Sequence, residues 1–173
     1  MAFSLHTMAT GTFVPMLRDL SGVLDKGAQH AKDEKLDPAT LVNAKLAPDM
    51  FALAMQVKIA CDHAEEATTR LSGGTFARKP EVDSSFGAMK ARIARTIADV
   101  ESVPSFAEDR EFDVPLMENM ELHVTALQLL KDWHLPNFYF HVVTAYDILR
   151  HAGVQIGKQD YMAHIRPMIR QKA

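Results

Sequence analysis

The sequence has one cysteine, no long apolar run and no excess of basic residues, and each absence excludes a class of protein. Cys61 has no partner for an intrachain disulfide, which fits a cytoplasmic location. The longest apolar run, residues 50–55, is far too short to span a membrane, and residues 1–17 lack the basic start of a signal peptide. The net charge of −3 provides no basic face for a phosphate backbone. We therefore expect neither a membrane nor a nucleic acid as partner.

The composition is that of an ordinary globular domain. Apolar residues make up 47% of the chain and charged residues 24%, which excludes wholesale disorder. A length of 173 residues is enough for one domain with a sizeable core. We predict a single domain over residues 1–173, with its core at about 4–162 and a short C-terminal tail.

Three segments in the first two thirds of the chain have apolar residues at helical spacing. The first begins at a Ser4 cap and runs to about residue 32, although Pro15 should kink it or mark a false start. After a short helical turn at residues 37–38, the second runs from residues 48–49 to about 72. Its apolar face comprises Met50, Leu53, Val57, Ala60, Ala64, Ala67 and Leu71. The third begins at Ser84 or Ser85 and ends at Pro104, with a stripe of Phe86, Met89, Ile93, Ile97 and Val100.

The last third changes character before it becomes helical again. Apolar and polar residues alternate over parts of residues 105–124, which predicts a small hairpin or an irregular connection. Thr125 can cap a short helix that residues 135–137 should interrupt at Pro136. The last long helix then runs from residue 137 to about 152, and one more helical turn is expected near 158–165. The whole pattern predicts an all-α four-helix bundle with a short insertion before the last helices.

Histidines on two of these helices indicate a candidate metal site. His141 lies near the apolar face of the last helix, with Asn137 one turn before it. His63 and Gln56 lie at the edge of the apolar face of the second long helix. Two imidazoles and an oxygen ligand could hold a divalent cation with open positions for water or substrate. The alternative is that both histidines are core-edge residues with one hydrogen bond each.

The spacing of the histidines gives little support of its own. No H-x-x-x-H or H-E-x-x-H pair is present, and Pro136 should break the register between His134 and His141. Trp133, Tyr139 and Tyr146 cluster around the last helices and can form either core or pocket walls.

Two stretches of the sequence resemble a bacterial family described as a domain of unknown function, similar to the DinB/YfiT-like bundles. They are Leu-Pro-Asn-Phe-Tyr-Phe-His at residues 135–141, with its continuation to residue 161, and Leu-Ala-Pro-Asp-Met-Phe at residues 46–51. The resemblance spans roughly residues 4–162. It implies a four-helix bundle that is often a homodimer. It also implies a divalent metal (zinc, nickel, manganese or iron) held by a histidine of the second helix and an H-x-x-x-H pair of the last. His141 resembles the second member of that pair, Asn137 stands in the place of the first, and His63 corresponds loosely to the helix-two ligand.

Two functions follow from these observations. The first is a metal-dependent enzyme, of the thiol-transferase or hydrolase type, with its site between the second and last long helices. The second is a non-catalytic dimeric bundle that binds a small molecule or serves as an accessory protein. In the second case His141 and Asn137 would form a buried hydrogen-bonded pair.

Overall fold

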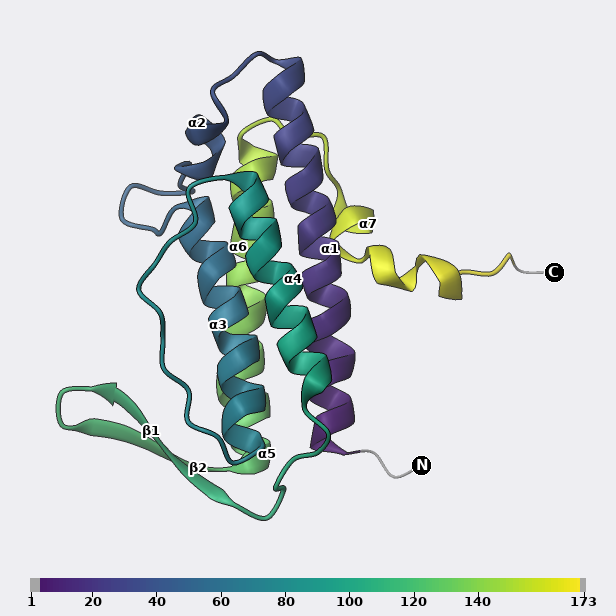
Figure 1. The fold of residues 1–173 in the computed structure, drawn as a ribbon. Coiled ribbons are helices and arrows are strands. Elements are labelled where there is room, and N and C mark those ends of the chain that lie inside the picture. The colour runs from purple at the N-terminus through teal and green to yellow at the C-terminus, as the bar shows by residue number, and fades with distance from the viewer. Residues whose placement is uncertain (1–3, 172–173) are drawn as a thin grey trace.

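Four long helices form a bundle in the computed structural model, which describes residues 4–171 (Figure 1). They are α1 (Leu5–Asp33), α3 (Leu53–Leu71), α4 (Phe86–Ser102) and α6 (Leu135–His151). The main packing partners are α3 with α6, and α4 with α1 and α3. Shorter elements are α2 (Pro38–Val42), α7 (Lys158–Tyr161) and a 3₁₀ segment, η2 (Ala163–Met168). The predicted all-α bundle is confirmed.

Serine side chains cap the starts of α1 and α4, as the sequence predicts. The Ser4 hydroxyl accepts a hydrogen bond from the Thr7 amide at 3.1 Å. Ser85, rather than Ser84, caps α4 in the same way. Pro15 is not a false start, because α1 continues through it. A proline ring in a helix crowds the carbonyl four residues earlier, which here belongs to Gly11.

The second long helix is shorter at its start than predicted. Residues 47–50 form a turn, and α3 begins only at Leu53, whose amide donates to the Ala44 carbonyl. It ends near Gly73, whose φ of +90° is the left-handed conformation that favours glycine. Six residues of the predicted apolar face are buried: Leu53, Val57, Ala60, Ala64, Ala67 and Leu71. Met50 lies before the helix.

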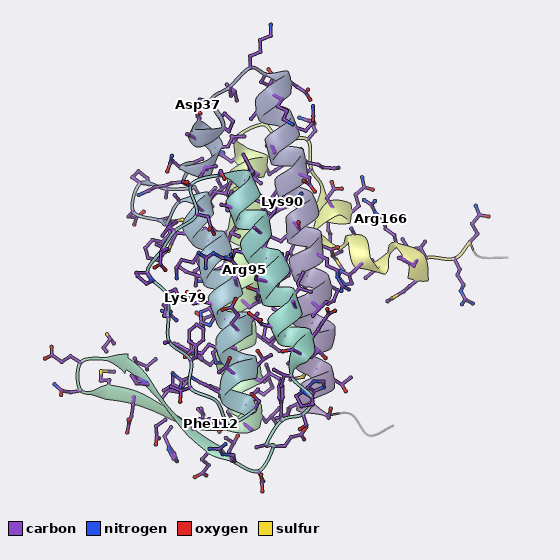
Figure 2. The ribbon with its side chains drawn as sticks, viewed as in Figure 1. Asp37, Lys79, Lys90, Arg95, Phe112 and Arg166 are labelled. Atoms are coloured by element: carbon purple, nitrogen blue, oxygen red, sulfur yellow. The ribbon has the colours of Figure 1, made fainter. Side chains whose placement is uncertain are left out.

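The alternating segment forms a two-stranded antiparallel hairpin of β1 (Glu111–Met117) and β2 (Met120–Thr125). It extends away from one end of the bundle (Figure 1). Figure 2 shows Phe112 where the hairpin meets that end. Val114 and Val124 are its buried side chains, whereas most of the others are exposed. The hairpin therefore adds little to the core, but Val114 and its neighbours cover part of a cavity.

The predicted interruption at Pro136 is also wrong. The chain stays helical from α5 (Ala126–Gln128) through a π-helical segment, η1 (Leu129–His134), into α6. The Leu135 amide donates to the Leu130 carbonyl, five residues earlier, so the turn before the proline is wide. Pro136 then occupies the first turn of α6, where a missing N–H costs little. This continuity places His134 and His141 on one helical segment.

Candidate functional site

Three histidines from separate segments meet between α3 and the last helical segment. His63 comes from α3, His134 from η1 and His141 from α6, and each is at most 9% exposed. The ring centres of His63 and His134 are 5.4 Å apart. Those of His63 and His141 are 6.0 Å apart, with an angle of 15° between the ring planes. The convergence of His63 and His141, predicted from their places on the helices, is therefore present.

Gln56 fixes the protonation of His141. Its Oε1 lies 2.6 Å from His141 Nδ1, and its Nε2 donates to the Phe51 carbonyl at 3.1 Å. Because the amide nitrogen is engaged by a carbonyl, the amide oxygen must face the imidazole as acceptor. Nδ1 of His141 therefore carries the proton, and Nε2 has a free lone pair.

The second histidine pair is joined through its Nδ1 atoms. Nδ1 of His63 lies 3.2 Å from Nδ1 of His134, so one of the two donates to the other. Nε2 of His134 is buried and has no hydrogen-bond partner. A buried acceptor without a partner is tolerated better than a buried N–H without one. This favours the tautomer in which His134 donates from Nδ1, which leaves a proton on Nε2 of His63.

All three imidazoles are neutral near pH 7. Burial, followed by the neighbouring His63, lowers the pKa of His134 to about 3. Burial, followed by His141 and the Arg78 guanidinium, lowers the pKa of His63 to about 4. Burial and Arg78 likewise lower the pKa of His141 to about 4. The site therefore provides imidazole groups that can form hydrogen bonds but carry no charge.

His63 and His141 line a cavity of about 320 Å³. Its apolar walls are Phe51, Ile59, Val114, Pro115, Leu116 and Trp133. Arg78 also lines it and pairs with Glu66 at 3.4 Å and with Asp62 at 3.5 Å. Within residues 4–171, His134 Nε2 is the one buried side-chain nitrogen or oxygen without a partner. Nε2 of His63 and of His141, which bond to no protein atom, are therefore accessible.

The other predicted site residues have different positions. Asn137 lines the cavity, but its Nδ2 donates to the Trp133 carbonyl at 2.7 Å. The predicted pair of Asn137 with His141 is therefore wrong, because His141 binds Gln56 instead. Gln56 is buried behind the imidazole and orients it. Neither tyrosine lines the cavity: Tyr139 is exposed, and Tyr146 packs against Tyr161 at 6.2 Å between ring centres.

The sequence-based prediction of the site omitted several residues that line or support the cavity, among them His134, Arg78, Phe51 and Leu116. His134 was set aside because Pro136 should have broken the helix. Arg78 lies in the linker, which has no periodic pattern, and Phe51 lies just before α3, within the range that was expected to be helical. The seven-residue spacing of His134 and His141 was the one available signal, since about two helical turns place residues on the same side.

The donor set does not fit the metal that the resemblance implies. Within the described part of the chain, no three His, Cys, Asp or Glu side chains are placed to hold one ion. The Asn137 amide is engaged by a backbone carbonyl, and Arg78 brings a positive charge to the cavity wall. Of the three imidazoles, His141 alone combines an accessible nitrogen with a free lone pair. The metal therefore stays a prediction.

Comparison with known proteins agrees with this architecture. Residues 5–162 match the family described as "Domain of unknown function (DUF1993)". A crystal structure of a DinB family member protein from Shewanella denitrificans is similar, with 32% sequence identity over 91% of each chain and a TM-score of 0.81. A search of curated proteins gave no match. Among the described residues, none of the helices combines the length and apolar character that crossing a membrane requires.

Proposed function

The chain belongs to the DUF1993 family of DinB-like bundles, and we propose that its histidine cavity binds a small neutral molecule with one polar end. A volume of about 320 Å³ lies at the lower end of the range for small-molecule sites. Apolar residues from α3, η1 and the hairpin form most of the wall, so the body of the ligand is apolar. Bundles commonly place such sites between facing helices.

The proposal rests on one observation: the cavity wall presents a hydrogen-bond donor, Nε2 of His63, together with a hydrogen-bond acceptor, Nε2 of His141. Nε2 of His141 accepts because Gln56 holds the proton on the other nitrogen. Nε2 of His63 donates because His134 occupies its Nδ1. A hydroxyl or a primary amide can both donate and accept a hydrogen bond, so either satisfies both imidazoles at once.

A neutral ligand is favoured over a charged one. Arg78 is already engaged by the Glu66 and Asp62 carboxylates, so an anion would have to compete with these ion pairs, and a cation would be repelled by the guanidinium. The homodimer expected from the resemblance is a separate prediction on which this proposal does not depend.

Binding also accounts for the site better than proton transfer. A pKa of about 4 makes His141 a weak base. Moving a proton to it from a thiol, with an ordinary pKa of about 8.5, costs roughly 6 kcal/mol. The alternative, a divalent-metal-dependent enzyme, would need a ligand set that these side chains do not form as arranged.

Fluorescence of Trp133 tests the proposal directly. Trp133 is the single tryptophan of the chain and lines the cavity, so its emission reports occupancy. We expect benzyl alcohol and benzamide to give saturable changes, and toluene and benzoate to bind at least about fivefold more weakly. His141→Phe should remove the preference for benzyl alcohol over toluene. His151→Gln, at the exposed end of α6, should retain it.

Two results would count against this function. Equal binding of toluene and benzyl alcohol would show that the imidazoles do not form hydrogen bonds with the polar group of the ligand. A stoichiometric metal, found by elemental analysis of protein purified without an affinity tag, would favour the metal-dependent enzyme instead. Circular dichroism of each variant shows whether it is folded.

A further inference from the structure

A groove of about 330 Å³ lies on the C-terminal segment of the chain. Its lining comes from α7, η2 and the residues next to them: Lys158, Gln159, Met162, Ile165, Arg166 and Ile169. None of these residues lines the histidine cavity. In Figure 1 the segment lies beside α1, and Figure 2 labels Arg166 on it. The groove is therefore separate from the site of the proposed function.

The apolar walls of the groove are aliphatic. They are formed by Met162, Ile165 and Ile169, and its lining contains no aromatic ring. Ile169 is 70% exposed, although an isoleucine is usually buried. An alkyl chain lying in the groove would remove this surface from water. The walls therefore fit a flexible hydrocarbon chain.

The polar groups at the groove have an excess of positive charge. Nη2 of Arg166 donates to the Gln159 carbonyl at 3.2 Å and to Asp160 at 3.3 Å. Asp160 also pairs with Lys26 at 2.8 Å, so one carboxylate faces two cations. Within residues 4–171, Lys158 has no ion partner, and no acidic side chain lines the groove. The groove therefore attracts an anion.

Bonds to α1 hold the groove in shape without a ligand. The backbone amide of His164, in η2, donates to Asp19 on α1 at 3.2 Å, and the imidazole bonds to the same carboxylate. Lys26, also on α1, holds Asp160, which in turn accepts from the Gly157 amide at 3.0 Å. Because α7 and η2 are both fixed to α1, a ligand does not have to order them.

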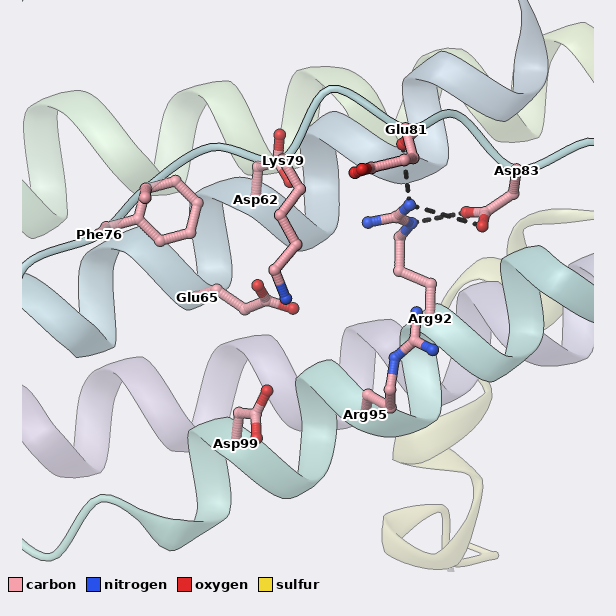
Figure 3. Close-up of a pocket in the computed structure, with 10 residues that line it drawn as sticks. Asp62, Glu65, Phe76, Lys79, Glu81, Asp83, Arg92, Arg95 and Asp99 are labelled. Carbon is pink, nitrogen blue, oxygen red and sulfur yellow. Dashed lines mark hydrogen bonds and ion pairs between the residues drawn. The ribbon is translucent and has the colours of Figure 1, made fainter.

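The larger cavity between α3, α4 and the linker of residues 72–85 differs in its chemistry (Figure 3). Carboxylates and basic groups both line it, and Arg92 binds Asp83 at 2.5 Å and the Glu81 carbonyl at 3.0 Å. These charges compensate one another within the chain. That cavity of about 480 Å³ therefore selects no ion of one sign, in contrast to the groove.

We infer that the groove binds an aliphatic carboxylate of medium chain length, such as octanoate. The alkyl chain lies on Met162, Ile165 and Ile169, and the carboxylate lies at Lys158 and Arg166. Both bonds of Arg166 come from one nitrogen, so Nε and Nη1 can still donate to the ligand. A guanidinium also matches the planar geometry of a carboxylate.

Both parts of this ligand are required. A short carboxylate such as butanoate would leave most of the apolar wall in water. An alkyl ammonium would be repelled by Lys158 and Arg166, and an uncharged alcohol would gain nothing from them. This ligand differs from the neutral molecule proposed for the histidine cavity.

Amide NMR of the full chain tests the inference with octanoate as the probe. We expect saturable shifts confined to α7, η2 and the adjoining turns of α1. Butanoate, 1-octanol and octylamine should each bind at least about tenfold more weakly. The emission of Trp133 should not respond to octanoate, because Trp133 lines the histidine cavity.

Two pairs of exposed variants separate the groove from its surroundings. Ile169→Asn should weaken octanoate binding about fivefold, whereas Met168→Asn, at an exposed neighbour that does not line the groove, should not. Lys158→Gln should also weaken binding about fivefold and reduce the preference for octanoate over 1-octanol. Lys32→Gln, at an exposed position of α1, should leave both unchanged.

Several results would overturn the inference. They are no saturable shift with octanoate, equal binding of octanoate and 1-octanol, equal binding of octanoate and butanoate, and shifts confined to the histidine cavity. Binding to vesicles of anionic phospholipid without binding of octanoate would assign the surface to a membrane instead. Because the histidine cavity is tested with neutral ligands, failure of one site is distinguishable from failure of the other.

Discussion

Gln56 and His141 are joined across α3 and α6 by a hydrogen bond of 2.6 Å between Oε1 and Nδ1. We expect ¹⁵N NMR at pH 7 to show His141 as the neutral Nδ1–H tautomer. Gln56→Glu places a carboxylate at the same nitrogen and should raise the pKa of His141 from about 4 by roughly one to two units. An Nε2–H tautomer in the wild type would contradict the arrangement.

The buried histidines should make the protein sensitive to acid. The pKa values of His63, His134 and His141 are about 4, 3 and 4, below the ordinary value of 6.5 that they regain on unfolding. The unfolded chain therefore binds more protons below pH 6.5. Stability is fully present above pH 6.5 and is lost as the pH falls toward about 3, by up to about 1.4 kcal/mol per pH unit for each histidine.

Urea unfolding at pH 7.5, 6 and 5 measures this loss. His134→Leu should make the free energy of unfolding depend less steeply on pH, because it removes the most deeply buried of the three rings. His151→Gln, which replaces an exposed histidine of α6, is the matched control. A free energy of unfolding that is constant from pH 7.5 to 5 would show that the imidazoles are not held neutral.

Asn137→His should create metal binding that the present side chains do not support. It adds an imidazole one turn before His141 on the same face of α6. We expect zinc or nickel to raise the melting temperature of the variant, by binding the native state, more than that of the wild type. Asn137→Ala should not gain a metal, and it should lose about 1 kcal/mol of stability with its bond to the Trp133 carbonyl. If the wild type and Asn137→His bound metal equally well, Asn137 would not be what prevents metal binding.

Local signals made most of the fold predictable. The capping residues Ser4 and Thr125 and the stripe from Phe86 to Val100 marked helices that the structure confirms. The effect of proline was predicted wrongly at Pro136, and Pro15 is not the false start that was one of its two expected effects. An α-helical period cannot reveal that the preceding turn widens into a π-helix.

The candidate site was predictable only in part, for a related reason. The convergence of His63 and His141 could be predicted from the sequence, because both residues lie on long segments with a helical period. Arg78 reaches the cavity from the linker, and Leu116 from the hairpin. Where such segments pack depends on tertiary contacts, which no local pattern contains.

Two glycines of α1 allow packing to be separated from helix propensity. A Cβ at Gly27 would lie 3.0 Å from the Phe86 ring and 3.1 Å from a Leu149 methyl group, whereas one at Gly22 would meet nothing within 4 Å. Alanine favours a helix interior over glycine by about 0.5–1 kcal/mol at either position. We therefore expect Gly22→Ala to stabilise the protein by about that amount.

Gly27→Ala should instead destabilise the protein by about 1–3 kcal/mol, because overpacking would push α1 away from α4 and α6. Urea unfolding of both variants gives the comparison. Because the helix and the substitution are the same, the difference between the two free energies isolates the crowding at Phe86 and Leu149. Similar stabilisation by both variants would show that this helix contact can shift to accept a methyl group.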